Sequence, residues 1–197
     1  NAMATDVYSN GTVAVGYQAL YTQNYGSATD SYNTALGYTA GYAVTTGTSN
    51  TFVGALSGDA QTTAANSSFV GYNSGSANTT GANNTAMGAN ALTANTTGGS
   101  ITAFGSSALT ANTEAANCVG IGAYALTANT TGANNVACGF SALAANTTAA
   151  NNSAFGAFTL DANTTGAQNT AYGYAALGAN TTASYNDAFG FQALDAC

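Results

Sequence analysis

Reactive side chains are scarce in this chain, and that limits the chemistry it can perform. Its 197 residues include no Lys, Arg or His and only 7 acidic residues, which give a formal net charge of −7. Without His or Lys the usual general bases are missing, and no Ser or Cys nucleophile can be paired with such a base. The acids do not form the close pairs that glycosidases use. We therefore expect no enzymatic activity and no catalytic residue.

Metal and cofactor sites are not expected either. Asp59, Asp161 and Asp195 occupy equivalent positions of a repeat, but no two of them fall in adjacent copies. Tandem G-G-x-G-x-D calcium motifs are absent, and a phosphate loop would need a Lys or a helix start. The cysteines lack metal-ligand spacing and are too few for a disulfide framework. We expect Cys118 and Cys138 to fall in different columns, Cys138 to be a small buried hydrophobe, and Cys197 to be exposed.

Composition also restricts the partners. A chain without Lys or Arg cannot neutralise a phosphate backbone or bind an anionic membrane surface. None of its apolar runs approaches the length of a membrane-spanning helix, so we expect no membrane insertion. No basic segment precedes an apolar stretch, so no signal peptide is expected. Asn1 and Ala2, before Met3, look like the remainder of an expression tag.

A single glycine recurs at a fixed period and organises the whole chain. From Gly37 to Gly190 it returns at every seventeenth position without a slip, and only the first spacer, from Gly16 to Gly37, is longer. Such a period is typical of a stacked array of structural units. We therefore expect residues 1–9 to be tag remnant and lead-in, and residues 10–197 to form one repeat domain. The repeated glycines are Gly16, Gly37, Gly54, Gly71, Gly88, Gly105, Gly122, Gly139, Gly156, Gly173 and Gly190.

The consensus around each glycine is N-T-A-φ-G, where φ is apolar or aromatic. Because the φ position is apolar in every copy, we expect this apolar column to be buried, so that Phe155→Ala would cost about 3–5 kcal/mol. The fourth residue after the glycine is Leu in eight copies and Gly in three, which are Gly41, Gly58 and Gly75. The apolar column consists of Val15, Leu36, Val53, Val70, Met87, Phe104, Ile121, Cys138, Phe155, Tyr172 and Phe189.

The repeat favours strands over helices. Two packed helices need 30 or more residues per unit, whereas N-T-A-φ-G-Y alternates with period two, with Thr, φ and Tyr on one face and Asn, Ala and Gly on the other. The spacer Asn-Thr-Thr-Gly is turn chemistry. The prediction is an all-β parallel β-solenoid of about eleven 17-residue coils, a rod of roughly 50 Å with stacked side-chain ladders. Which face lines the coil is left open by the alternation alone.

These residues resemble known repeat families. N-T-A-L-G-Y-T-A-G (33–41), N-T-F-V-G-A-L-S-G (50–58) and N-N-T-A-M-G-A-N-A-L (83–92) resemble the tandem repeats of phage tail-fibre and tail-spike-like proteins. They also resemble the head repeats of trimeric autotransporter adhesins. The resemblance implies a left-handed β-roll in a homotrimer, and a fibre or adhesin head or stalk that attaches to a host-cell receptor or glycan. It implies an extracellular, cell-surface or virion-surface location. The repeat here is longer than the adhesin repeat, so the coil should be wider.

Two other surface features allow more than one interpretation. The Asn-Thr-Thr sites match the N-glycosylation pattern, but we favour turns. The aromatic residues just after the glycines could pack in a core or interface or could stack on sugars, and we favour packing. The Asn-Thr-Thr sites begin at Asn78, Asn95, Asn129, Asn146, Asn163 and Asn180.

An ice-binding solenoid is the alternative function. Repeated Thr pairs such as Thr96-Thr97 and Thr130-Thr131 would form adjacent columns able to order water. Against this, the pairs lie beside Gly in an apparent turn, a strand-borne T-x-T pattern is absent, and Glu114 interrupts the column.

Overall fold

A computed structural model describes residue 2 and residues 9–195 of the chain. Asn1, most of the predicted lead-in and Cys197 lie outside the described residues. The described residues form thirteen short strands and no helix. The strands are β1 (Ser9–Asn10), β2 (Val13–Val15), β3 (Thr29–Asp30), β4 (Thr34–Leu36), β5 (Thr51–Val53), β6 (Ser68–Val70), β7 (Thr85–Met87), β8 (Thr102–Phe104), β9 (Val119–Ile121), β10 (Val136–Cys138), β11 (Ser153–Phe155), β12 (Thr170–Tyr172) and β13 (Asp187–Phe189).

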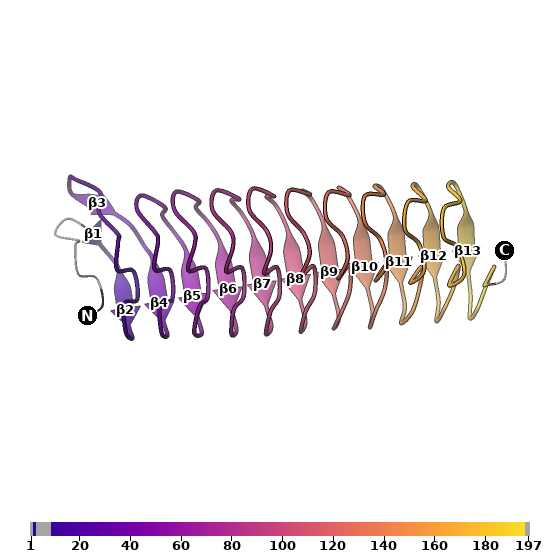
Figure 1. Ribbon diagram of the computed structural model, residues 1–197, viewed down its shortest axis with the longest axis horizontal. Coiled ribbons are helices and arrows are strands. Elements are labelled where there is room, and N and C mark those ends of the chain that lie inside the picture. Colours follow the sequence, from indigo (N-terminus) through magenta and orange to yellow (C-terminus); the bar gives the residue numbers. More distant parts are fainter. Residues whose placement is uncertain (1, 3–8, 196–197) are drawn as a thin grey trace.

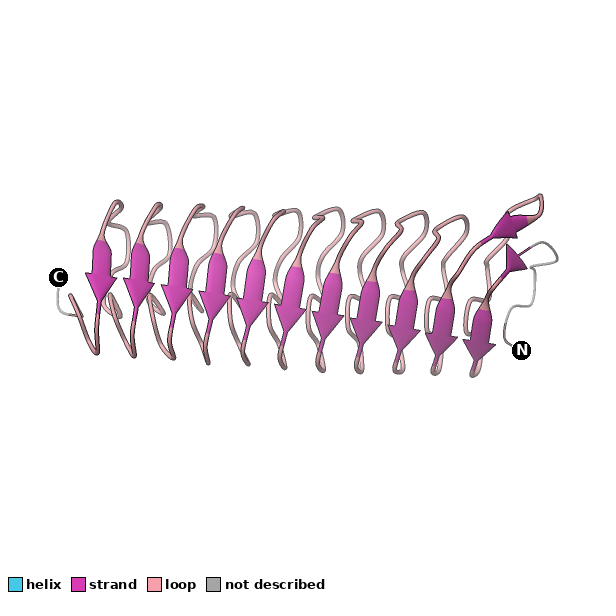
Figure 2. Ribbon diagram, turned by 180° about the vertical axis from the view of Figure 1, so that it is seen from behind, coloured by secondary structure: helices cyan, strands magenta, loops and turns pink. Residues whose placement is uncertain are grey.

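The strands stack into a rod. β2 and β4 to β13 form one 11-stranded parallel sheet in chain order, with β2 and β13 at opposite ends of the row (Figure 1). Seen from behind, all these strands point the same way and the turns close each coil (Figure 2). Equivalent repeat residues pair directly, as Ala137 does with Ala154. The predicted all-β parallel solenoid of about eleven coils is confirmed.

The longer first spacer builds an extra feature at the N-terminal end. β1 and β3 pair in a separate 2-stranded parallel sheet. The Tyr25 hydroxyl donates to the carbonyl of Gly47 at 2.6 Å, and the Asn33 amide donates to the same carbonyl at 2.7 Å. These bonds tie the irregular first coil to the regular coils that follow.

The recurring glycine forms a sharp corner at the end of each sheet strand. Gly105 has a φ of 137°, and an added Cβ would lie 2.6 Å from the carbonyl carbon of Gly122 in the next coil. Both the backbone conformation and the close approach require glycine. This line of glycines, named here the glycine corner, therefore explains the strict period.

The apolar column faces outward, so the prediction that it forms the core is wrong. Leu36 is 49%, Phe104 50% and Phe189 68% exposed, whereas the middle residue of every strand from β4 to β13, such as Ala103, is buried. The alternation of faces was predicted correctly, but the inner side is the Asn-Ala-Gly face. A coil of 17 residues encloses too little volume to hold a bulky side chain at every inward position. The small residues therefore face inward and the apolar column faces outward.

Leucine supplies most of the interior volume. The Leu four residues after the glycine is buried in every copy from Leu92 to Leu177. Its backbone is left-handed, with a φ of 56° at Leu92 and 52° at Leu109. This conformation is rare for Leu and costs about 1–2 kcal/mol. Burial of about 1.5–3 kcal/mol per leucine side chain offsets that cost.

Two ladders of buried asparagine complete the interior. In the first, the Asn129 amide donates to Asn112 Oδ1 at 3.1 Å and to the Gly132 carbonyl at 3.0 Å. In the second, Asn135 Oδ1 accepts from the backbone N–H of Asn152 at 2.9 Å. Each buried amide is thus satisfied by the neighbouring coil, which makes burial of so many polar groups possible.

Candidate functional site

The described part of the chain forms no pocket. It contains no group of three or more His, Cys, Asp and Glu residues that could hold a metal ion. No helix among the described residues is long and apolar enough to cross a membrane. The candidate functional site is therefore a surface of the rod.

The first surface is the apolar column itself. It runs unbroken along the outer face of the sheet, with one apolar side chain on each strand of the row. Near the C-terminal end its rings stack in register, Phe155 on Tyr172 at 4.6 Å and Tyr172 on Phe189 at 5.2 Å between centroids. Soluble monomers rarely expose contiguous apolar patches larger than a few hundred Å², so this column is a candidate contact surface.

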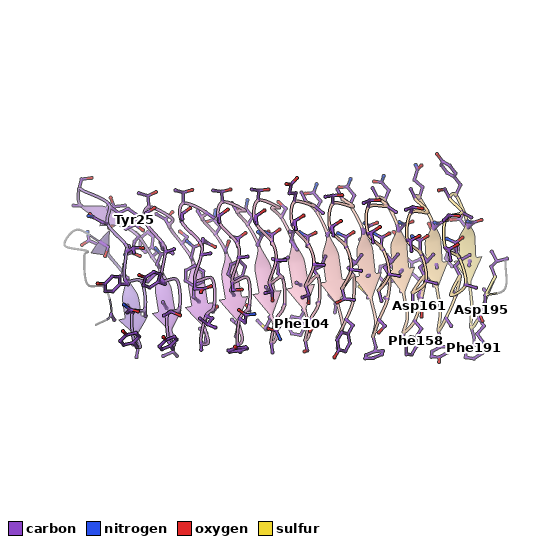
Figure 3. The ribbon with its side chains drawn as sticks, in the orientation of Figure 1. Tyr25, Phe104, Phe158, Asp161, Phe191 and Asp195 are labelled. Atoms are coloured by element: carbon purple, nitrogen blue, oxygen red, sulfur yellow. The ribbon has the colours of Figure 1, made fainter. Side chains whose placement is uncertain are left out.

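A second line of large apolar side chains lies on the other side of the glycine corner, one or two residues after the glycine. Phe158 and Phe191 lie with Phe104 along the lower edge of the rod (Figure 3). Only the coils of Gly88 and Gly105 lack such a residue. We name this line the aromatic edge; it comprises Tyr17, Tyr38, Leu56, Tyr72, Tyr124, Phe140, Phe158, Tyr174 and Phe191.

The rings of the aromatic edge mostly contact one another. Tyr174 and Phe191 stack at 5.4 Å with an interplanar angle of 12°, and Phe140 meets Phe158 edge to face at 5.3 Å. In both arrangements a ring face is occupied by the neighbouring ring. Because sugar stacking needs an open ring face, this geometry favours the packing interpretation. The residues are not in the core, since Tyr174 is 47% and Phe191 72% exposed.

The opposite side of the rod is polar and regular. Its outer threonines, such as Thr97 and Thr131, are exposed, whereas the inner Thr96 hydroxyl donates to the Thr113 carbonyl at 3.1 Å. Exposed asparagines bond from coil to coil, as Asn134 does to Asn151 at 3.3 Å. We name this side the polar edge; it comprises Thr63, Thr80, Thr97, Glu114, Thr131, Thr148, Thr165 and Thr182 with Asn66, Asn83, Ser100, Asn117, Asn134, Asn151, Gln168 and Tyr185.

The Asn-Thr-Thr sites are not available for modification in the folded chain. Asn95 and Asn129 are fully buried, as are the equivalent asparagines in the other coils, apart from Asn180 at 4% exposure. Their amides carry the first buried ladder. The turn interpretation of these sites is therefore confirmed.

The two described cysteines differ in environment. Cys118 is buried and its thiol contacts the Gly132 carbonyl at 3.3 Å, and burial raises its pKa. Cys138 is only partly buried, because it belongs to the outward-facing apolar column. The predicted burial of Cys138 is thus wrong for the same reason as that of its column. Burial still raises the pKa of the Cys138 thiol, so neither described thiol is activated as a nucleophile.

Two carboxylates approach each other although they are two coils apart. A Cβ added to Gly178 would lie 2.6 Å from Asp195 Oδ1 and 3.5 Å from Asp161 Oδ1. Both side chains lie in the C-terminal part of the rod (Figure 3). Desolvation, and then repulsion by Asp195, raise the pKa of Asp161. The sequence did not reveal this pair, because only the missing side chain at Gly178 lets the two carboxylates approach the same point.

Comparison with known proteins found no match to a family model. No curated protein and no solved structure is significantly similar to the chain.

Proposed function

We propose that this protein is a structural segment of a fibre or adhesin, a head or stalk assembled as a homotrimer outside the cell or on a virion. Its work is mechanical extension and display of a repetitive surface for attachment to a host-cell receptor or glycan. It is not an enzyme and needs no cofactor, and neither nucleic acid nor a membrane interior is its partner.

The observation that carries this proposal is the combination of a straight row of parallel strands with an uninterrupted outward apolar column. The row supplies length, with neighbouring strands about 4.8 Å apart. The column supplies a surface that a soluble chain needs to cover. Light scattering on the purified chain tests the trimer directly: the expected mass is three times the 19.2 kDa of one chain, and a 19.2 kDa species would contradict it.

Attachment is assigned to the polar edge. Its hydroxyls and amides repeat once per coil, which suits a ligand that is itself repetitive, such as an extended glycan. A glycan array probed with the labelled chain tests this assignment. Binding that is lost when Thr131, Thr148 and Thr165 are all changed to Val would support it. Binding that survives this change would contradict the polar edge as the attachment surface.

Ice binding is the second candidate. It is favoured by the regular spacing of the exposed threonines, including Thr131 and Thr148, on successive coils. Such an array can order water if its spacing matches the ice lattice. Thermal hysteresis and faceting of ice crystals in a nanolitre osmometer are the test. Hysteresis that depends on those threonines would replace the adhesin function with ice binding.

A further inference from the structure

We propose that three copies associate side by side through the two flanks of the glycine corner, with the apolar column of one copy packed on the aromatic edge of the next. This inference rests on the homotrimer proposed above and adds which faces meet. It is drawn from the distribution of apolar area, the distribution of charge and the shape of the corner.

Apolar area is concentrated on these two flanks. The apolar column has a side chain on every strand of the 11-stranded sheet, and the aromatic edge follows the same corner on its other side. Ten steps of about 4.8 Å make the strip about 48 Å long. At that length a width of about 17 Å, or about five extended residues across both flanks, gives ~800 Å² per copy, which a ring divides between the two contacts that each copy makes. The columns that flank the glycine supply this width.

Charge is nearly absent from the same flanks. Each copy carries a net charge of −7 with no side-chain cation, so copies repel wherever their acids meet. Glu114 lies on the polar edge, and Asp59, Asp161 and Asp195 lie in a column five residues after the glycine. Along the outer face of the sheet only Asp187, in the terminal strand β13, is charged. The glycine corner is thus the side on which copies can approach.

The shape of the corner favours a ring. Both flanks of one corner are apolar, and a two-fold contact between identical flanks would leave the other flank of each copy exposed. A heterologous contact, in which one flank meets the other flank of the next copy, covers both when the ring closes. Three copies form the smallest such ring. Their corners then converge on the axis, which brings equivalent residues of the apolar column close together.

Cys138 provides a test without changing the interface. It is the partly exposed cysteine of the apolar column, and a Cys197→Ser background leaves it as the accessible thiol because Cys118 is buried. A short bis-maleimide should convert two of every three chains into a covalent dimer on a denaturing gel. The matched control carries Cys138→Ala and Thr148→Cys, which moves the thiol to the exposed polar edge. It should remain monomeric on the gel.

Two substitutions made together test the same contact between copies by removing part of it. Phe104→Thr with Ile121→Thr replaces two outward side chains that are 50% and 43% exposed, so each coil should still fold, as circular dichroism can check. The expected mass in solution falls to 19.2 kDa. The control Thr97→Asn, on the polar edge, should keep the mass of the unmodified chain.

The outcomes separate this inference from the proposed function. Cross-linking at Cys138 together with dissociation of the Phe104 and Ile121 variant would support the glycine corner as the interface. A trimer that cross-links only at Thr148→Cys, or that persists after the double substitution, would contradict the glycine corner as the interface. The proposed trimeric fibre would still be supported. A monomeric unmodified chain would overturn both.

Discussion

Phe52 and Gly58 fill one another's space inside the coil: a Cβ added to Gly58 would lie 2.4 Å from Cε1 of Phe52. The same holds one coil later for Phe69 and Gly75, at 2.6 Å. In the coil of Gly37, Ala35 is combined with Gly41, and the neighbouring Phe52 and Leu20 occupy the space beside Gly41. In the other coils the strand centre is Ala, or Gly at Gly120, and the turn supplies Leu, as in Ala103 with Leu109. The two forms of the repeat therefore fill the same small cross-section in two ways. Either a large residue at the strand centre is combined with a glycine in the turn, or a small residue at the strand centre is combined with a leucine in the turn.

This exchange predicts strong coupling between the two positions. Phe52→Ala alone should cost about 3–5 kcal/mol by leaving a cavity, and Gly58→Leu alone about 1–3 kcal/mol by overpacking. The double variant recreates the Ala-Leu form, so its loss of unfolding free energy should be smaller than the sum of the two single losses. Urea unfolding of all four chains gives the coupling energy. Additive losses would mean that the two side chains do not share space.

The buried amide ladder predicts a clear difference between neighbouring turn positions. Asn129→Ala leaves Asn112 Oδ1 without its Asn129 donor and removes the Asn129 Oδ1 atom to which the Asn146 amide donates, at about 1–3 kcal/mol for each unsatisfied group. The Gly132 carbonyl still accepts from the Asn135 amide. Thr131→Ala, at an exposed position two residues on, should stay within about 0.5 kcal/mol. Thermal unfolding compares the two. Equal melting temperatures would show that the ladder does not stabilise the coil.

The Asp161–Asp195 pair predicts that stability depends on pH. The pKa of Asp161 is raised above its ordinary 3.8 by desolvation and then by Asp195, so the folded chain holds this proton more tightly than the unfolded chain. Ionisation above the raised pKa therefore lowers stability. Asp161→Asn should raise the melting temperature at neutral pH, with the gain disappearing as the pH falls below 3.8.

Asp59 provides the control for that pH dependence. Burial also raises its pKa, but without repulsion from another carboxylate, so the gain from Asp59→Asn should not change in an Asp195→Asn background, whereas the gain from Asp161→Asn should shrink there. A gain for Asp161→Asn that persisted in acid would place its origin outside the ionisation of Asp161.

The reversed faces of the strand predict different behaviour for two large side chains of one coil. Leu160 is fully buried, and Leu160→Ala should cost about 2–5 kcal/mol at every protein concentration. Phe155 lies in the apolar column and stacks on Tyr172, a pair worth about 0.5–1.5 kcal/mol beyond area burial. Phe155→Ala should therefore act mainly on assembly, and its effect should fade on dilution below the dissociation concentration. If Phe155→Ala lost as much unfolding free energy as Leu160→Ala at all dilutions, Phe155 would be a core residue and not an assembly residue.

The sequence predicted the period, the parallel stacking and a strand within each N-T-A-φ-G-Y segment, because the glycine corner and the T-A-φ alternation constrain all three. It did not predict β1 and β3, which form their own sheet. It did not predict which face lies inside. Alternation separates two faces, and the larger apolar residues on one of them suggested a core. The volume of one coil decides otherwise, since Ala at the strand centre with Leu from the turn already fills it. The Phe52–Gly58 and Phe69–Gly75 exchange was visible in the sequence and could have revealed the inner face.

The candidate site was predicted only in part for the same reason. A column thought to be core became the main exposed surface, and the aromatic residues after the glycine became its second flank. The Asn-Thr-Thr turns were predicted correctly, but their role as a buried hydrogen-bonded ladder depends on stacking across coils. No single copy of the repeat shows that stacking.

Small-angle X-ray scattering tests the central claim most directly, because it gives mass, length and cross-section together. The account predicts a particle of three times 19.2 kDa whose length stays about 50 Å, the length of one stack of eleven strands about 4.8 Å apart. Its cross-section should be that of three rods side by side. A particle of one chain mass with the same length, or one that lengthens as its mass grows, would contradict side-by-side assembly at the glycine corner.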